Sequence, residues 1–144
     1  MRKGNASALR RGRYSCTGHI YHIIITCKNR YPFFNDPSLA RYAVLCLKRL
    51  TPEAFTLAFV VMPDHIHWLM KLNDIKNLSE TVRLLKVMVT QKAGTPIWQS
   101  GYYDHALRKE EAIEDVARYI VLNPVRAGLC ENVRQYPWWD YVYL

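Results

Sequence analysis

The sequence predicts an α+β fold with a mainly antiparallel sheet, of the ferredoxin-like or RRM-like plan, with helices packed on one face. The order of the expected elements is strand, helix, strand, strand, helix, short strands and helix. The strands expected over residues 55–62 and 65–72 are joined by a Pro-Asp pair alone, which predicts an antiparallel hairpin. Strands that alternate with helices in this order are typical of a split βαβ arrangement. The other face of the sheet is then left for a ligand.

The composition is ordinary for one globular domain, and its charge favours a polyanionic partner. The 144 residues are 50% hydrophobic and 22% charged, which is ordinary for a single folded unit. Lysine and arginine outnumber aspartate and glutamate by 20 to 12, a net charge of +8. Such an excess favours nucleic acid over a membrane surface as partner. We expect one domain over residues 1–144, with a basic arm at 1–15 and a C-terminal tail at 130–144.

The cysteines and the apolar segments indicate a cytoplasmic protein. No Cys-x-x-Cys pair occurs, so we expect reduced thiols at all four positions, Cys16, Cys27, Cys46 and Cys130. No apolar run approaches the roughly 18 residues that a membrane span needs, and no signal-peptide core follows the basic N-terminus. No membrane partner is expected.

The first half of the chain supplies two strands and a helix. Residues 18–26 (GHIYHIIIT) are β-branched and aromatic and predict a strand, on which His19 and His22 face opposite ways. We therefore expect structural roles for both histidines. Asp36-Pro37 predicts a helix start, and Thr51-Pro52 its end. The strand over residues 55–62 follows.

The second half supplies two more helices. Apolar residues at helical spacing predict a helix from residue 78 to Gly94, with basic residues on its other side, among them Arg83 and Lys86. Short strands are expected over residues 97–99 and 102–107. A last helix is expected over residues 109–122, with Glu110 and Glu111 in its first turn and an apolar stripe formed by Ile113, Val116, Ala117, Ile120 and Val121.

Two groups of residues carry the chemistry. His65 and His67 lie one residue apart in an expected strand, so both rings point to one face and can converge on one metal ion. The competing interpretation is that both rings are hydrogen-bonded structural groups. Tyr119 and Asn123 lie four residues apart, off the apolar stripe, so they share a helix face. Pro124 predicts that the helix ends at Asn123.

The ordered set of motifs resembles the single-tyrosine HUH transposases, and within them the REP-associated tyrosine transposase branch. The resemblance spans nearly the whole chain and rests on Tyr21-His22-Ile23, Val61 to His67, Ile97 to Asp104, Ala106-Leu107-Arg108 and Arg118 to Leu129. It implies a catalytic Tyr119, and metal ligation by His65, His67 and Asn123. Insertion-sequence relatives tend to carry Gln where this chain has Asn123.

The resemblance also implies the substrate and partners. It implies Mg²⁺ or Mn²⁺ as cofactor, no small-molecule cofactor, and cleavage and rejoining of single-stranded DNA hairpins by a monomer or a homodimer. Arg10-Arg11 resembles an N-terminal pair that reads bases beside a hairpin, but the arm can also be solvated charge. The residues expected to contact DNA are Arg10, Arg11, Arg13, Arg83, Lys86, Arg108 and Arg126.

The chemistry is consistent without the resemblance, and two alternatives stay open. A tyrosine hydroxyl has a pKa of about 10, so it is a poor nucleophile unaided, and a divalent ion beside it would help by polarising a phosphate. Attack would leave a 5′-phosphotyrosine and a 3′-OH. The first alternative is a non-catalytic module that only binds hairpins. The second is a metal-dependent hydrolase that uses water as the nucleophile.

Overall fold

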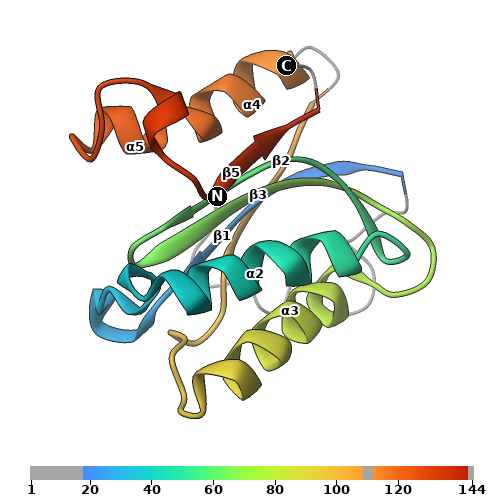
Figure 1. Ribbon diagram of the computed structural model, residues 1–144. Coiled ribbons are helices and arrows are strands. Elements are labelled where there is room, and N and C mark those ends of the chain that lie inside the picture. The colour runs from blue at the N-terminus through green and yellow to red at the C-terminus, as the bar shows by residue number, and fades with distance from the viewer. Residues whose placement is uncertain (1–17, 109–111, 143–144) are drawn as a thin grey trace.

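The computed structural model describes residues 18–108 and 112–142, which form a five-stranded antiparallel sheet with helices on both sides (Figure 1). The strand order is β4-β1-β3-β2-β5. The strands are β1 (Ile20–Thr26), β2 (Ala54–Met62), β3 (His65–Leu72), β4 (Tyr103–Ala106) and β5 (Trp139–Tyr141). The helices are α2 (Pro37–Arg49), α3 (Leu78–Ala93), α4 (Ile113–Val121) and α5 (Asn123–Arg126).

The strand order contains the predicted ferredoxin-like plan. The β1–α2–β2 unit has β3 between its two strands, and the β3–α3–β4 unit has β1 between its two strands. Two interleaved βαβ units of this kind define the split βαβ arrangement. The predicted α+β class is therefore confirmed. β5 extends the plan by pairing with β2 at the edge of the sheet.

The hairpin of β2 and β3 has the predicted connection. Met62 pairs with His65, so Pro63 and Asp64 alone join the two strands. The β3 strand therefore begins at the first histidine and lies in the centre of the sheet, between β1 and β2. A position in the central strand fixes the backbone of both histidines from two sides.

Local sequence signals set the ends of α2 and α3. The Asp36 side chain accepts a hydrogen bond from the Ser38 amide at 3.0 Å, and Pro37 occupies the first turn of α2, as predicted. Asn77 and Glu80 form a reciprocal capping box at the start of α3. The α3 helix ends at Gly94, whose φ of 76° is the left-handed conformation that glycine adopts without a Cβ clash.

The two faces of the sheet have separate cores. One core lies under α2 and α3 and contains alternate residues of the central strands, for example Ile23, Ile25 and Trp68. The second core lies under α4 and contains Val60 and Leu69 from the sheet, together with Ala117, Ile120, Val121 and Tyr141. Figure 1 shows α4 and α5 on the side opposite to α2 and α3.

This arrangement corrects the expectation that the helices pack on one face. The expectation holds for α2 and α3, whereas α4 packs on the opposite face against β2 and β3. The apolar stripe of α4 needs an apolar surface, and the first face is already covered by two helices. Val60 and Leu69 offer such a surface on the second face, and both are fully buried there.

The C-terminal segment differs from a simple tail. Residues 133–135 form a 3₁₀ turn, and Tyr136 donates a hydrogen bond from Oη to the Val61 carbonyl at 2.6 Å. The chain then enters β5, which pairs with β2 through Val60 and Trp139. No sequence pattern predicts this strand. Its pairing extends the sheet on the side where α4 packs.

Smaller differences concern element ends. β1 begins at Ile20, two residues later than expected, and the strand expected over residues 97–99 is a single bridge between Cys27 and Trp98. The α4 helix begins at Ile113; the expected first turn with Glu110 and Glu111 lies outside the described residues. No helix in the described ranges combines the length and hydropathy needed to span a membrane.

Candidate active site

His65 and His67 lie on the face of β3 that α4 partly covers. Both lie an even number of residues from Leu69 along the strand, so their side chains point to the same face as Leu69, which belongs to the core under α4. Their ring centroids are 5.0 Å apart. His67 is buried, with 7% of the residue exposed. The prediction that the two rings share one face is therefore confirmed.

An acidic partner orients His65. The Asp64 Oδ1 atom lies 2.7 Å from His65 Nδ1, and Asp64 Oδ2 accepts a hydrogen bond from Arg30 Nε at 3.0 Å. Partial burial would raise the pKa of Asp64, but the hydrogen bond and charge of His65 and the Arg30 guanidinium outweigh it and lower the pKa. The ionised carboxylate can only accept, so His65 Nδ1 donates, and Nε2 stays outside this hydrogen bond.

A second histidine orients His67. The His67 Nδ1 atom lies 2.9 Å from His22 Nε2, and their ring centroids are 5.1 Å apart. One ring must donate and the other accept, which leaves His67 Nε2 outside this hydrogen bond. His22 is therefore part of the site, in direct contact with a predicted metal ligand. Its position in the sequence predicted only a structural role, because the pairing of β1 with β3 is what brings His22 beside His67.

The environment keeps the rings of His22 and His67 neutral near pH 7. Burial, together with the charges of His22, His65 and Arg126, lowers the pKa of His67 from 6.5 to about 3. Burial and His105 lower the pKa of His22 from 6.5 to about 4. Only a neutral imidazole has a lone pair for a metal ion. Metal binding at neutral pH therefore costs no deprotonation of His67.

The row of polar rings continues onto β4. His105 pairs with His22 across β1 and β4, and the Tyr103 ring lies edge-on to the His22 ring with centroids 6.2 Å apart. These side chains are half-buried. The part of this face over β1 and β4 thus carries His22, Tyr103 and His105, whereas α4 packs on Val60 and Leu69 over β2 and β3.

Tyr119 lies on α4 beside an arginine. Tyr119 is 54% exposed, and the Arg126 guanidinium carbon lies 3.8 Å from the centre of the tyrosine ring. Arg126 Nη2 also donates to the Tyr119 carbonyl at 2.5 Å. The same guanidinium is close enough to His67 to lower its pKa. Arg126 is therefore a common neighbour of the tyrosine and of the histidine pair.

Asn123 begins α5 one turn after Tyr119, and its side-chain nitrogen has no hydrogen-bond partner. Its Nδ2 atom is buried and is the one buried side-chain nitrogen or oxygen without a hydrogen bond in the described part of the chain. Buried amides normally have partners, so an orphaned one indicates a site for a further group. The two ends of an amide interchange by rotation, so the same position can present oxygen to a metal ion.

The donor set fits a divalent ion. His65 Nε2, His67 Nε2 and the Asn123 amide oxygen would be two imidazoles and one neutral oxygen. Within residues 18–108 and 112–142 no cluster of three His, Cys, Asp or Glu side chains could hold a metal. The candidate set therefore depends on the amide, and three protein ligands leave further positions for a substrate.

The structure distributes the predicted DNA-contact residues widely. Arg126 lies at the site, and Arg108 follows β4. Arg83 and Lys86 lie on α3, on the other side of the sheet, where Lys86 Nζ donates to the carbonyls of Gln99 at 3.1 Å and Gly101 at 2.7 Å. Lys86 therefore also holds the loop before β4. The arm residues Arg10, Arg11 and Arg13 lie outside the described residues.

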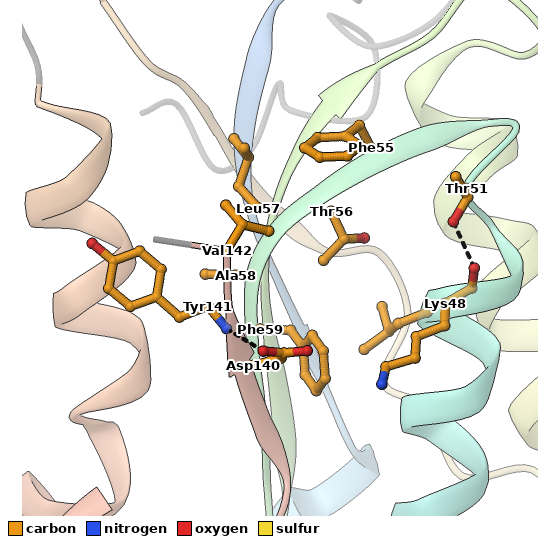
Figure 2. Close-up of a pocket in the computed structure, with 11 residues that line it drawn as sticks. Lys48, Thr51, Phe55, Thr56, Leu57, Ala58, Phe59, Asp140, Tyr141 and Val142 are labelled. Carbon is orange, nitrogen blue, oxygen red and sulfur yellow. Dashed lines mark hydrogen bonds between the residues drawn. The ribbon is translucent and has the colours of Figure 1, made fainter. Parts of the chain in front are cut away.

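A mainly apolar pocket lies apart from the histidines. It has a volume of about 150 Å³ and lies between α2 and the β2–β5 edge, where Lys48, Phe55, Phe59, Asp140 and Val142 contribute to its wall. Figure 2 shows that the side chains around it come from these elements and include none of the candidate catalytic residues. The chemistry of the site therefore does not depend on this pocket.

Comparison with known proteins assigns the chain to a class of DNA-processing enzyme, the transposases. The model of the family described as "Transposase IS200 like" matches residues 15–123. This match covers most of the chain and includes the histidine pair, Tyr119 and Asn123. The protein belongs to the IS200-like transposase family.

Individual relatives narrow the comparison to one branch. The chain is 28% identical to the REP-associated tyrosine transposase of Escherichia coli K12 over 130 residues, 87% of this chain and 78% of the relative. It is 30% identical to a REP-associated tyrosine transposase assigned in Haemophilus influenzae over 100 residues, 58% of this chain and 56% of the relative.

Solved structures agree with the sequence comparison. A REP-associated tyrosine transposase bound to a REP hairpin superposes with a TM-score of 0.75 at 26% identity, covering 91% of this chain and 81% of the other. A transposase structure from Deinococcus radiodurans shares the fold, with a TM-score of 0.52 at 20% identity, covering 76% of this chain and 94% of the other. The resemblance to REP-associated tyrosine transposases is confirmed.

Proposed function

We propose that the protein cleaves and rejoins single-stranded DNA at hairpin sequences through a covalent phosphotyrosine on Tyr119. One observation carries this proposal. The helix with Tyr119 packs on the sheet face that presents His65 and His67, and Arg126 lies near both the tyrosine and His67. A hydroxyl nucleophile and a pair of imidazoles thus belong to one side of the molecule.

The metal is part of the proposal. His65, His67 and Asn123 would hold Mg²⁺ or Mn²⁺, which when bound would supply a Lewis acid for a phosphate oxygen. The residues themselves favour this role. Asp64 and His22 each occupy the Nδ1 atom of one histidine, which leaves the Nε2 atoms for binding.

The reaction exchanges one phosphodiester bond for another. Tyr119 Oη attacks phosphorus, the bond to the 3′ oxygen breaks, and that oxygen leaves and takes up a proton, while the tyrosine loses one. The products are a 5′-phosphotyrosine and a free 3′-OH. Because no water is consumed, a second 3′-OH can attack the phosphotyrosine and join strands without ATP.

The substrate is inferred from charge and from kinship. The net charge of +8 favours a polyanion, and a solved relative of 26% identity was determined with a REP hairpin bound. The sheet face that carries His22, His65 and His67 is called the histidine face. Its open part adds aromatic surface at Tyr103, on which unpaired bases can stack. Hairpin DNA with a single-stranded flank meets both requirements.

The test is a denaturing gel of the protein with labelled REP-type hairpins and Mn²⁺ or Mg²⁺. We expect a covalent protein–DNA band that EDTA prevents. Tyr119→Phe should reduce it by about 10⁴-fold or more, because the nucleophile is gone. Tyr31→Phe is the matched control, since Tyr31 is 59% exposed and lies outside the site. This control should behave like the wild type.

Other outcomes identify the alternatives. Cut DNA without attached protein would indicate hydrolysis by water and would contradict the role of Tyr119. Tight hairpin binding without any cleavage under either metal would indicate a non-catalytic binding module. A band that persists in Tyr119→Phe would move the nucleophile to another residue, with Tyr102 and Tyr103 the first to examine.

A further inference from the structure

The loop after β1 contains a strained turn that contacts the start of β3. The 3₁₀ turn Lys28–Arg30 has two consecutive residues in the left-handed region, Asn29 with φ of 56° and Arg30 with φ of 55°. Residues with a Cβ rarely adopt this conformation, and two in succession persist only where surrounding contacts impose them. The strain therefore calls for an explanation in the contacts of this turn.

Backbone hydrogen bonds fasten the loop to the hairpin turn before His65. The Cys27 amide donates to the Asp64 carbonyl at 2.9 Å, and the Phe34 amide donates to the Pro63 carbonyl at 2.9 Å. The two ends of the loop thus form backbone hydrogen bonds with both residues of the β2–β3 turn. Between these anchors the left-handed pair directs the Arg30 side chain back onto the same turn.

The result is a chain of three side chains that ends at a metal-ligand candidate. Arg30 Nε donates to one oxygen of Asp64 at 3.0 Å, and the other oxygen of Asp64 lies 2.7 Å from His65 Nδ1. With one oxygen held by Arg30, the carboxylate cannot rotate away from His65. His65 in turn has one tautomer and one ring orientation, with Nε2 free of this contact.

We propose that Arg30 is a positioning residue for the metal site, acting on His65 through Asp64. This inference rests on the proposed function, because it assigns His65 to a metal ion. An exposed ion pair alone adds little to stability, and the Arg30 side chain is 63% exposed. The contribution of Arg30 is therefore to metal affinity and not to the free energy of unfolding.

The experiment compares five proteins: wild type, Arg30→Ala, Arg30→Lys, Asp64→Ala and the control Arg41→Ala. Arg41 is an exposed arginine of α2, so the control removes the same charge at a position outside the three-residue chain. The measurements are the tautomer of His65 by nitrogen-15 NMR of the metal-free protein, Mn²⁺ affinity by titration calorimetry, and urea unfolding. Arg30→Lys is included because it keeps the charge but not the directed Nε donor.

We expect wild type and Arg41→Ala to have His65 protonated at Nδ1 and equal Mn²⁺ affinity. Asp64→Ala should mix the two tautomers and weaken Mn²⁺ binding by about 10- to 100-fold, and Arg30→Ala should weaken it by about tenfold. Arg30→Lys should restore affinity only in part. Urea unfolding should change little between Arg30→Ala and Arg41→Ala.

Different outcomes would contradict the positioning role of Arg30 and the proposed reaction. An unchanged tautomer and unchanged Mn²⁺ affinity in Arg30→Ala would overturn the positioning role, even if the wild type forms the covalent band. A wild type that forms no covalent band but shows the expected tautomer and affinity changes would overturn the proposed reaction and leave the positioning role intact. A wild type that binds neither Mn²⁺ nor Mg²⁺ would overturn both.

Discussion

The two faces of the sheet differ in how completely helices cover them, and the difference explains where the chemistry lies. Under α2 and α3, the central strands present a mainly apolar surface, and two helices bury it. On the opposite face, α4 covers the part over β2 and β3, and the part over β1 and β4 keeps half-buried histidines. Half-buried polar side chains therefore gather where none of the described helices covers the sheet.

A single strand shows both environments. The residues of β1 alternate strictly between half-buried and buried, so neighbouring positions report on opposite faces. Ile23 is fully buried under the α2 and α3 layer, and Ile24 lies half-buried on the histidine face. The same residue type at adjacent positions thus allows the two faces to be compared by substitution.

The largest expected effect on stability comes from this pair. Ile23→Ala should lower the free energy of unfolding by about 2 to 5 kcal/mol, because it leaves a cavity in a packed core. Ile24→Ala should cost about 1 kcal/mol, since solvent or a neighbouring side chain can fill the space. Urea denaturation measures both. Equal losses would show that the histidine face is as tightly packed as the other.

A change of pH should have a smaller effect on the free energy of unfolding, and it should act only through the histidine face. The pKa values of His22 and His67 fall from 6.5 to about 4 and about 3, so between pH 6.5 and 4 the unfolded chain binds more protons. The free energy of unfolding should therefore drop as the pH falls through this range. The neighbouring charges that act on these two rings are His65, His105 and Arg126.

The variant His22→Gln tests this assignment. It removes one titrating ring and retains a hydrogen-bonding side chain, so its stability should fall less than that of the wild type between pH 7 and pH 5. We expect a difference on the order of 1 kcal/mol in urea titrations at the two pH values. Identical losses in both proteins would place the acid sensitivity elsewhere.

The smallest effect is expected on the solvent side of α4. Arg118 and Asp115 form an ion pair at 3.3 Å, and their side chains are 59% and 76% exposed. Arg118→Ala should therefore change the free energy of unfolding by less than about 0.5 kcal/mol. A thermal melt beside the wild type is sufficient to measure this. A large loss would mean that the outer side of α4 also contributes to packing.

Local patterns predicted most of the fold, because local physics sets most of it. The capping residues Asp36 and Asn77, the Pro63-Asp64 connection and the αL glycine at Gly94 lie at or close to the predicted boundaries. β5 was not predicted, because a strand of three residues has too few alternating positions to produce a pattern. Its partner β2 is distant in sequence, and only the folded chain brings the two together.

The site was predicted in part for a similar reason. His65 and His67 lie in one strand, so a period of two residues places both rings on one face. His22 lies in another strand, and its contact with His67 depends on the register of β1 against β3, which sequence periodicity does not contain. The side of the sheet on which α4 packs is equally a property of the whole fold. Metal ligation and the role of Tyr119 remain predictions.

The position of β5 gives the molecule an order of assembly during translation. A ribosome completes β1, β2 and β3 first, so both histidines leave it long before residues 113–142. The apolar surface at Val60 and Leu69 stays uncovered until α4 emerges, and β5 and the Tyr136 hydrogen bond follow it. A nascent chain can therefore present its imidazole pair early, but the tyrosine takes its place only after residues 113–142 have been made.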